Sequence, residues 1–307
     1  MSRRRFIKQI GAGATLLSFA PLELLAAKEE IIKISILHTN DMHSRIECFT
    51  SGRNKGAGGM LQLASVIKQI RAQEENILLL DAGDIFQGTP YFNYYGGELE
   101  FKLMSEMGFD ASTLGNHDFD NGIDGLVKQL PHANFQFLSA NYDVSNTALN
   151  GHTLPHKIFN KNGIKIGVFG LGIELAGLVD PKLYKDTIYI DPIRIANEQA
   201  NLLKNELNCE LIICLSHLGY SYKSKKVSDR VLAQETSNID LIIGGHTHTF
   251  LKEPKLLENK VGKEVLINQV GFGAIKLGKV DFYFEKSRRT KKFESASLAV
   301  KNDAKFV

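Results

Sequence analysis

The stretch Leu241-Ile242-Ile243-Gly244-Gly245-His246-Thr247-His248 is the most informative part of the chain. Its apolar residues fit one short buried strand, which runs directly into two glycines and a His-x-His pair. Glycines let a backbone approach a ligand closely, and residues two apart in an extended segment point to the same side. The stretch therefore predicts a strand of an α/β sheet with a ligand site at its carboxyl end.

Four other segments repeat this arrangement of an apolar run followed by polar side chains. The runs Ile31–Leu37, Ile77–Leu80, Ala111–Leu114 and Leu211–Leu215 are followed in order by Asp41 and His43, Asp84, Asn116, and His217. Because the carboxyl ends of parallel strands meet at one edge of a sheet, we expect these side chains to converge. Imidazoles with carboxylates suit divalent cations such as zinc, manganese or iron.

The rest of the chain alternates helical and extended patterns. Helices are expected at Met60–Arg71, Glu98–Met107, Asp124–Leu130, Ile193–Leu207 and Val227–Gln234, and a hairpin turn at Lys161-Asn162-Gly163. Val265–Val270 and Leu277–Phe284 are interpreted as antiparallel strands. This order predicts one large α/β domain, residues 28–285, with two sheets covered by helices. Residues 286–307 are interpreted as a polar, solvated C-terminal tail.

Residues 1–27 have the features of an export signal. Ser2-Arg3-Arg4-Arg5-Phe6-Ile7-Lys8 is similar to the twin-arginine consensus, and a mildly apolar run from Ile10 to Ala27 follows it. Pro21 and Glu23 interrupt that run, which is too short and broken for a stable membrane span. We therefore expect a periplasmic or otherwise exported protein with a twin-arginine-type signal, which is either cleaved after Ala27 or retained as an anchor.

The net charge argues against a nucleic-acid partner. The formal charge is +3, and it is accounted for by the four basic residues and one acidic residue of the signal segment. The mature chain is therefore near neutral, whereas bulk attraction to a nucleic acid needs a basic excess. Cys209 and Cys214 flank or occupy one predicted strand, too far apart for a disulfide.

Several residues outside these segments are expected to have structural roles. His132, His152 and His156 are expected at the surface or in the hairpin. For the cluster Tyr91, Phe92, Tyr94 and Tyr95, core packing is favoured over lining a pocket wall. Asp81 and Asp118 are expected to support the site or form turns, and His38 either supports the site or packs.

The ordered set D-x-H, G-D, G-N-H-[DE], H and G-H-x-H resembles the calcineurin-like metallophosphoesterase superfamily. Within it, Gly115-Asn116-His117-Asp118-Phe119-Asp120 and Gln87-Gly88-Thr89 resemble the catalytic domain of the 5′-nucleotidase family. The resemblance extends from about Ile34 to Phe284 and implies a four-layer α-β-β-α sandwich with two mixed sheets.

The resemblance also implies a site for two divalent metal ions. One ion is expected to bind Asp41, His43 and His248, the second Asn116, His217 and His246, and Asp84 is expected to bridge both. A hydroxide between the ions would then attack phosphorus in line with the leaving oxygen. His117 is expected to stabilise developing charge or donate a proton, and Asp120 to orient its ring.

The implied activity is hydrolysis of a small phosphate monoester by an exported, 5′-nucleotidase-like enzyme. Relatives in that family usually carry a C-terminal domain that binds the nucleoside, and this sequence ends soon after the last expected catalytic strand. Three alternatives remain open: an open-site phosphomonoesterase, a phosphodiesterase acting on cyclic nucleotides or nucleotide sugars, or a catalytic half that needs a separate nucleotide-binding polypeptide. A non-catalytic binding module is disfavoured because all seven ligands and the His117–Asp120 pair are present.

Overall fold

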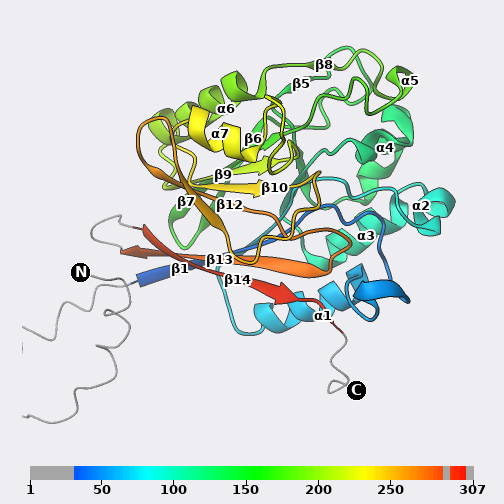
Figure 1. Ribbon diagram of the computed structural model, residues 1–307, viewed down its shortest axis with the longest axis horizontal. Helices are drawn as coiled ribbons and strands as arrows, with labels where there is room; N and C mark the ends of the chain where they lie inside the picture. Colours follow the sequence, from blue (N-terminus) through cyan, green and yellow to red (C-terminus); the bar gives the residue numbers. More distant parts are fainter. Residues whose placement is uncertain (1–30, 286–290, 302–307) are drawn as a thin grey trace, which may run out of the picture.

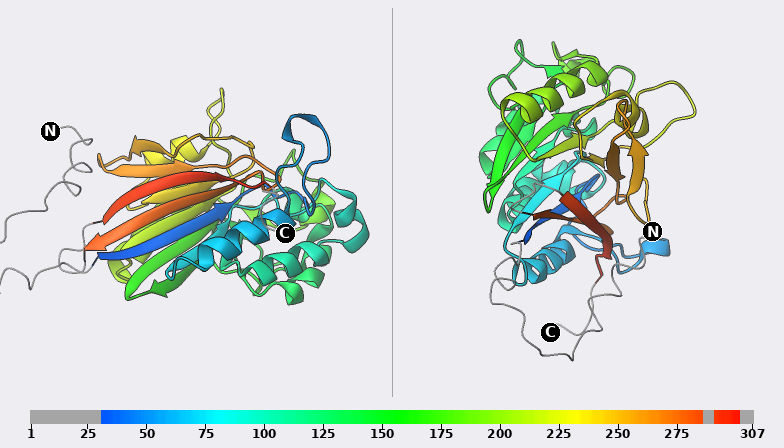
Figure 2. Two further views of the ribbon diagram at one scale, coloured as in Figure 1. Left: turned by 90° about the horizontal axis from the view of Figure 1, so that it is seen from below. Right: turned by 90° about the vertical axis from the view of Figure 1, so that its left-hand side faces the viewer.

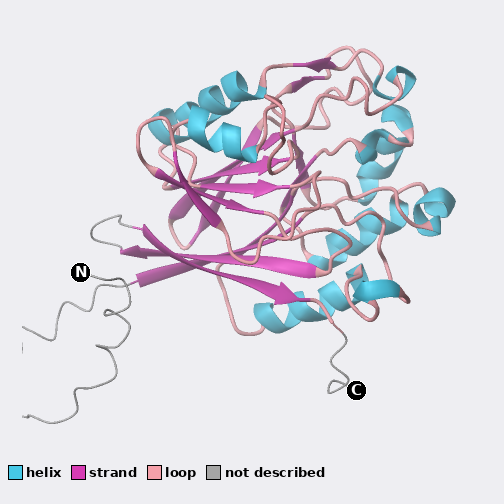
Figure 3. Cartoon of the chain, in the orientation of Figure 1, coloured by secondary structure: helices cyan, strands magenta, loops and turns pink. Residues whose placement is uncertain are grey.

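The computed structural model describes residues 31–285 and 291–301 as four layers, with two mixed β-sheets stacked between two sets of helices (Figures 1 and 3). The right-hand view of Figure 2 looks along the strands and shows α6 (Pro192–Asn201) above the sheets and α1 (Met60–Arg71) below them. The predicted α-β-β-α sandwich with two mixed sheets is confirmed.

The first sheet has the strand order β14-β13-β1-β2-β3-β4. Strands β1 to β4 are parallel, while β13 pairs antiparallel with β1 and β14 pairs antiparallel with β13. The bounds are β1 Ile31–Thr39, β2 Ile77–Asp81, β3 Ala111–Thr113, β4 Gln136–Leu138, β13 Lys276–Glu285 and β14 Lys291–Ala299.

The second sheet has the order β11-β12-β10-β9-β7-β6, with four parallel strands in the middle and an antiparallel strand at each edge. The bounds are β6 His156–Lys161, β7 Ile164–Leu171, β9 Leu211–Ser216, β10 Leu241–Gly244, β11 Lys255–Glu258 and β12 Glu264–Asn268. A separate ribbon pairs β5 (Tyr142–Asp143) with β8 (Ile188–Tyr189). The predicted hairpin is confirmed, because Asn162 and Gly163 both have positive φ between β6 and β7.

Alternation along the strands produces the layers. Side chains such as Ile36 and Ile213 face the space between the sheets and form a central core. Their neighbours Leu37 and Ile212 point outward, into two further cores beneath the helices. The first sheet is covered by α1, α3 (Glu98–Met107) and α4 (Gly122–Gln129), and the second by α6 and α7 (Asp229–Glu235). The short helices α2 (Pro90–Tyr95) and α5 (Pro181–Tyr184) lie in connecting segments.

The interpretation of Val265–Val270 and Leu277–Phe284 as an antiparallel pair is wrong. Strand β12 lies in the second sheet, parallel to β10, and β13 lies in the first sheet, antiparallel to β1. The residues between them, 269–275, cross from one sheet to the other. This crossing segment carries Gly271 and Gly273 at positive φ, which lets the chain turn between two layers.

The interpretation of residues 286–307 as a solvated tail is also corrected. Within it, Lys291–Ala299 forms β14, the outermost strand of the first sheet. Its polar sequence misled the prediction because an edge strand exposes much of its surface, and charged residues are common there. Phe293, opposite Phe282, is still 39% exposed.

Candidate metal centre

The predicted site residues lie in loops that follow five strands. The loops after β1, β2 and β3 of the first sheet carry Asp41, His43, Asp84 and Asn116. The loops after β9 and β10 of the second sheet carry His217, His246 and His248. Backbone hydrogen bonds join these loops, for example from Asp41 N to Gly83 O and from Gly245 N to Ser216 O, both 2.9 Å. The structure therefore brings the predicted side chains together at one edge of the sandwich.

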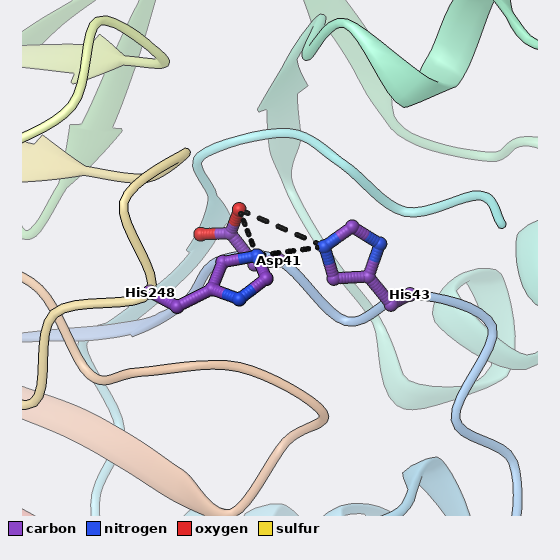
Figure 4. A group of neighbouring side chains, drawn as sticks. All are labelled: Asp41, His43 and His248. Carbon is purple, nitrogen blue, oxygen red and sulfur yellow. Dashed lines mark hydrogen bonds and ion pairs between the residues drawn. The ribbon is translucent and has the colours of Figure 1, made fainter. Parts of the chain in front are cut away.

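Asp41, His43 and His248 form a first group whose donor atoms all lie within 4.8 Å of one another. Figure 4 shows the two imidazoles and the carboxylate facing one another from two loops, Asp41 and His43 from the loop after β1 and His248 from the loop after β10. His43 Nε2 lies 2.9 Å from His248 Nε2, and Asp41 Oδ1 lies 3.4 Å from His248 Nε2. Neighbouring ligands around one tetrahedral zinc ion are roughly 3.3 Å apart, so this spacing suits a shared cation.

Asp84, His217 and His246 form a second group of the same kind. His217 Nε2 lies 3.1 Å from Asp84 Oδ2. Asn116 Oδ1 lies 2.8 Å from His246 Nδ1, which adds a neutral oxygen to the group. All four of these residues were predicted ligands.

Asp84 lies between the two groups. Its Oδ2 is 3.9 Å from His43 Nε2 in the first group and 3.1 Å from His217 Nε2 in the second. The carboxylate is fully buried, and its Oδ1 accepts a hydrogen bond from His117 N at 2.8 Å. This position is the one that a carboxylate shared by two cations needs.

The orientation of the histidine rings fits a metal. His217 Nδ1 donates to Ala82 O at 2.7 Å and His43 Nδ1 faces Phe86 O at 3.3 Å, so each ring turns Nε2 toward the site. Histidine ligands commonly donate their second ring N–H to a carbonyl in this way. His217 Nε2 is buried and lies 3.1 Å from Asp84 Oδ2, but it is not aligned for a hydrogen bond with any described residue. A cation would satisfy that nitrogen, and the donor set suits zinc, manganese or iron.

The charges of the site interact strongly with one another. Burial would raise the pKa of Asp84, but the adjacent His217 and then His43 outweigh it and hold the pKa well below its usual range. Burial lowers the pKa of His217, yet contact with Asp84 raises it to about 10. Burial lowers the pKa of His246 to about 4. Among the described residues, no lysine or arginine forms an ion pair with Asp41 or Asp84.

The backbone of the site is strained in a consistent way. Five of the seven predicted ligands have positive φ: Asp41, His43, Asp84, His246 and His248, with φ between 49° and 69°. Residues other than glycine rarely adopt this backbone conformation, and it is concentrated at functional sites. The tight loops that it produces point successive side chains at one centre.

His117 and Asp120 form the predicted pair beside the metal groups. His117 Nδ1 lies 2.8 Å from Asp120 Oδ2, and this hydrogen bond raises the pKa of the imidazole. The His117 ring lies 5.3 Å from that of His43, measured between centroids. Its other ring nitrogen, Nε2, is therefore available to a ligand bound at the site.

Asp118 supports the site without belonging to either group. Its carboxylate accepts backbone N–H bonds from Asp84 and Gly115 on one oxygen and from Ile85 and Phe86 on the other, at 2.8–3.2 Å. One buried side chain thus fixes the loop of Asp84 against the loop of Asn116. Asp81 accepts bonds from Thr39, Gly83 and Ser112 and has a similar supporting role.

Three residues that the sequence did not single out also shape the loops. Asn40 donates to Asp41 Oδ2 and to Gly271 O, both at 2.6 Å, and so joins the site to the crossing segment. Gln269 bonds Gly245 O, Thr247 Oγ1 and Thr249 N around the His-x-His loop. Phe272 stacks on His248 with ring centroids 5.1 Å apart. Asn40 follows a predicted strand end, but nothing local marks Gln269 or Phe272.

The structure also places the remaining histidines and the cysteines. His132, His152 and His156 lie outside the site; His132 approaches Glu98 and His156 bonds Gln199. His38 is fully buried and contacts Asn268 at 2.9 Å, and burial lowers its pKa to about 3, as expected of a packed histidine. All three cysteines are free.

The aromatic cluster after the Asp84 loop was only partly predicted. Phe92 packs in the core, but Tyr94 is 83% exposed and Tyr95 is 46% exposed. Core packing is therefore wrong for these two tyrosines, which face outward on α2.

The predicted export signal, residues 1–27, lies outside the described residues. Within the residues that are described, no helix is long and apolar enough to cross a membrane.

Known proteins are similar to this chain in sequence and in fold. The family model described as calcineurin-like phosphoesterase matches residues 34–250. The chain is 38% identical over 229 residues to the snake venom 5′-nucleotidase of Crotalus adamanteus, covering 71% of this chain and 37% of that protein. It is 35% identical over 250 residues to the human 5′-nucleotidase, covering 76% and 42%. The crystal structure of a 5′-nucleotidase precursor from Thermus thermophilus superimposes with a TM-score of 0.79 at 29% identity, covering 89% of this chain and 55% of that one. The chain thus spans about two fifths of the length of the curated relatives it matches.

Proposed function

Because the chain belongs to the calcineurin-like phosphoesterase family, we propose that it hydrolyses phosphate monoesters as a 5′-nucleotidase-like enzyme with two bound divalent cations. One observation carries this proposal: two groups of metal-binding side chains meet at a single buried carboxylate, Asp84.

We assign the first cation to Asp41, His43 and His248 and the second to Asn116, His217 and His246, with Asp84 shared. When bound, two such cations supply an activated water and neutralise charge on the phosphoryl oxygens. Asp118 and Gln269 hold the ligand loops in place through backbone hydrogen bonds, so the ligand set is preorganised. His217 is fully buried, whereas His248 is 40% exposed, and we therefore place substrate entry on the His248 side.

His117 is assigned a role in the reaction itself. Asp120 fixes the ring through Nδ1, which leaves Nε2 directed away from that contact. From there the imidazole donates a hydrogen bond to a phosphoryl oxygen, or a proton to the leaving oxygen. Asp120 keeps the ring in the orientation that either role requires.

We also propose that the protein is exported. This rests on the twin-arginine-like segment Ser2–Lys8, which lies outside the described residues. Cell fractionation of wild type and of a variant with Arg3→Lys and Arg4→Lys tests it. Periplasmic recovery of wild type and cytoplasmic retention of the variant are expected; cytoplasmic recovery of both would contradict it.

In an alternative, this chain catalyses the same reaction, but a second polypeptide supplies part of the substrate-binding site. The chain matches only 37–43% of the length of several curated 5′-nucleotidases, so a separate polypeptide that contributes a nucleotide-binding domain remains a candidate partner. Co-purification with such a protein, and a fall in KM when the two are mixed, would favour this alternative.

Metal analysis joined to a substrate panel tests the main proposal. Two divalent ions per chain are expected, with hydrolysis of nucleoside monophosphates and simple monoesters faster than that of phosphodiesters. Activity should disappear on chelation and return when zinc, manganese or iron is added. The His152→Ala variant, which changes an exposed histidine outside the site, should match wild type. Full activity in metal-free protein would rule the proposal out.

A further inference from the structure

A pocket of about 590 Å³ lies between the segment Arg45–Thr50 and helix α2. Small-molecule sites usually fall between roughly 300 and 1,000 Å³, so its size suits a ligand larger than a phosphate. None of the residues that line it is a proposed metal ligand. Its walls contain three of the four clustered aromatic residues, Tyr91, Tyr94 and Tyr95.

Helix α2 presents Tyr94 and Tyr95 outward, while Tyr91 is partly buried against the core. Phe92 anchors the helix in the core, where it lies 5.1 Å from the ring of Phe86. Tyr91, Tyr94 and Tyr95 occur at i, i+3 and i+4 and share the pocket side of the helix. Tyr94 and Tyr95 form an edge-on pair with centroids 4.9 Å apart. An exposed aromatic group of this kind, held on a fixed helix, marks a surface that a ligand covers.

The opposite wall adds polar groups. Arg45 lies over the Phe49 ring at 4.2 Å, and it forms no ion pair with any described carboxylate. Glu47 contacts the phenol of Tyr91 across the pocket and raises its pKa. A guanidinium and a carboxylate beside aromatic rings can bind the polar edge of a planar group while the rings contact its face.

The pocket adjoins the metal centre through both of its walls. Arg45 is two residues after His43, so their Cα atoms are at most about 7.6 Å apart. On the other wall, Thr89 Oγ1 lies 2.9 Å from Ser44 Oγ and donates to Ser44 O at 2.7 Å. Gly88 packs so closely on His43 that an added Cβ would lie 2.8 Å from the His43 carbonyl oxygen. The first metal group and the pocket therefore share one junction of loops.

We propose that this pocket binds the leaving group of the substrate, and that the leaving group carries a planar aromatic ring such as a nucleobase. The inference rests on the proposed phosphomonoesterase function, because it places the phosphate at the metal centre. A tyrosine face then stacks on the ring, and Arg45 and Glu47 bind its polar edge. The chain thus contributes its own contacts to the leaving group, whatever other polypeptide acts with it.

Adenosine 5′-monophosphate and ribose 5-phosphate form a matched substrate pair, because they share the phosphate and sugar and differ in the ring. The test compares kcat/KM for both in the full-length wild type and in the Tyr94→Ala, Tyr95→Ala double variant. Base–aromatic stacking predicts a loss of about tenfold or more for adenosine 5′-monophosphate. Ribose 5-phosphate should change by less than about twofold. Equal losses on the two substrates, or no loss on either, overturn the proposal.

The control is Phe293→Ala, which removes a partly exposed aromatic ring from β14 and should leave both substrates unchanged. Binding of adenosine itself, followed by saturation-transfer NMR, separates this proposal from the proposed function. If wild type hydrolyses neither ester, the phosphomonoesterase proposal fails, while adenosine binding that the double variant loses still supports the pocket. An adenosine signal that is absent, or the same in both proteins, overturns it.

Discussion

The two ends of the first sheet differ in whether lysine side chains neutralise their acidic residues. Near the amino end of β1, Lys33 and Lys279 form ion pairs with Glu74 and Asp281 at 2.5–3.1 Å, and the Ser35 hydroxyl lies within hydrogen-bond distance of both carboxylates. At the carboxyl end, the ion-pair contacts of Asp41 and Asp84 among the described residues are all to imidazoles. At the amino end, the lysines of the chain thus neutralise its acidic residues.

This contrast shows how a structural charge cluster differs from a binding centre. A buried carboxylate without a compensating cation is costly, and of these two ends the carboxyl end is the one whose carboxylates lack a described lysine or arginine partner. Both ends contain acidic residues at strand termini, so acidity alone does not mark the site. What marks it is the absence of lysine and arginine partners among the described residues, together with a buried His217 Nε2 that contacts Asp84 without an aligned hydrogen bond.

The largest expected effect comes from Asp84→Ala, which removes the shared carboxylate. We expect loss of bound metal and a fall in kcat/KM of about a thousandfold or more, since metal ions contribute several kcal/mol to such reactions. Kinetics and metal analysis measure both. An active variant that keeps its metal contradicts the assignment of Asp84.

Removing the metal from wild type should have the next largest effect. Binding to the folded state alone contributes about 4 kcal/mol when free metal is at about a thousand times Kd. Thermal unfolding with and without a chelator measures this. If a chelator leaves the unfolding temperature unchanged, the carboxylates at the carboxyl end do not need a bound cation for stability.

His117→Ala should separate catalysis from metal binding. We expect the metal content of wild type with a loss in rate of about a hundredfold, since general acid–base groups contribute roughly that much or more. Asp120→Asn should have a smaller effect in the same direction. Loss of metal in His117→Ala would show that this histidine is a ligand.

The smallest expected effect is the loss of stability at low pH from the charge cluster at the amino end. The hydrogen bonds and lysines around Glu74 and Asp281 overcome the opposing effect of burial and lower the pKa of both. Stability from these contacts is therefore present above the unfolded pKa values, near 4, and is lost as pH falls through the folded values. We expect a loss of about 1 kcal/mol, given the partial exposure of the cluster. Urea unfolding from pH 7 to pH 3 measures it, and Asp281→Asn should flatten the dependence.

The sequence predicted that these side chains converge at the carboxyl end because the signals are local. Each predicted ligand follows an apolar run, so Asp41, Asp84 and His217 could be placed without knowing how the sheets stack. The amino end was not predicted, since Glu74 and Asp281 meet only when β13 lies beside β1. Gln269 and Phe272 were missed for the same reason: their roles depend on the segment that crosses between sheets. Strand β14 was missed because an edge strand and a polar tail have similar composition.

The left-handed backbone of five proposed ligands also limits how the site can change over evolutionary time. At His248 or His246, any replacement must tolerate positive φ as well as supply a donor atom. Asparagine and aspartate enter that conformation more readily than glutamine, glutamate or cysteine do. Mutational drift of this metal set should therefore favour short oxygen donors, which would shift its preference from softer to harder cations before the loops themselves were lost.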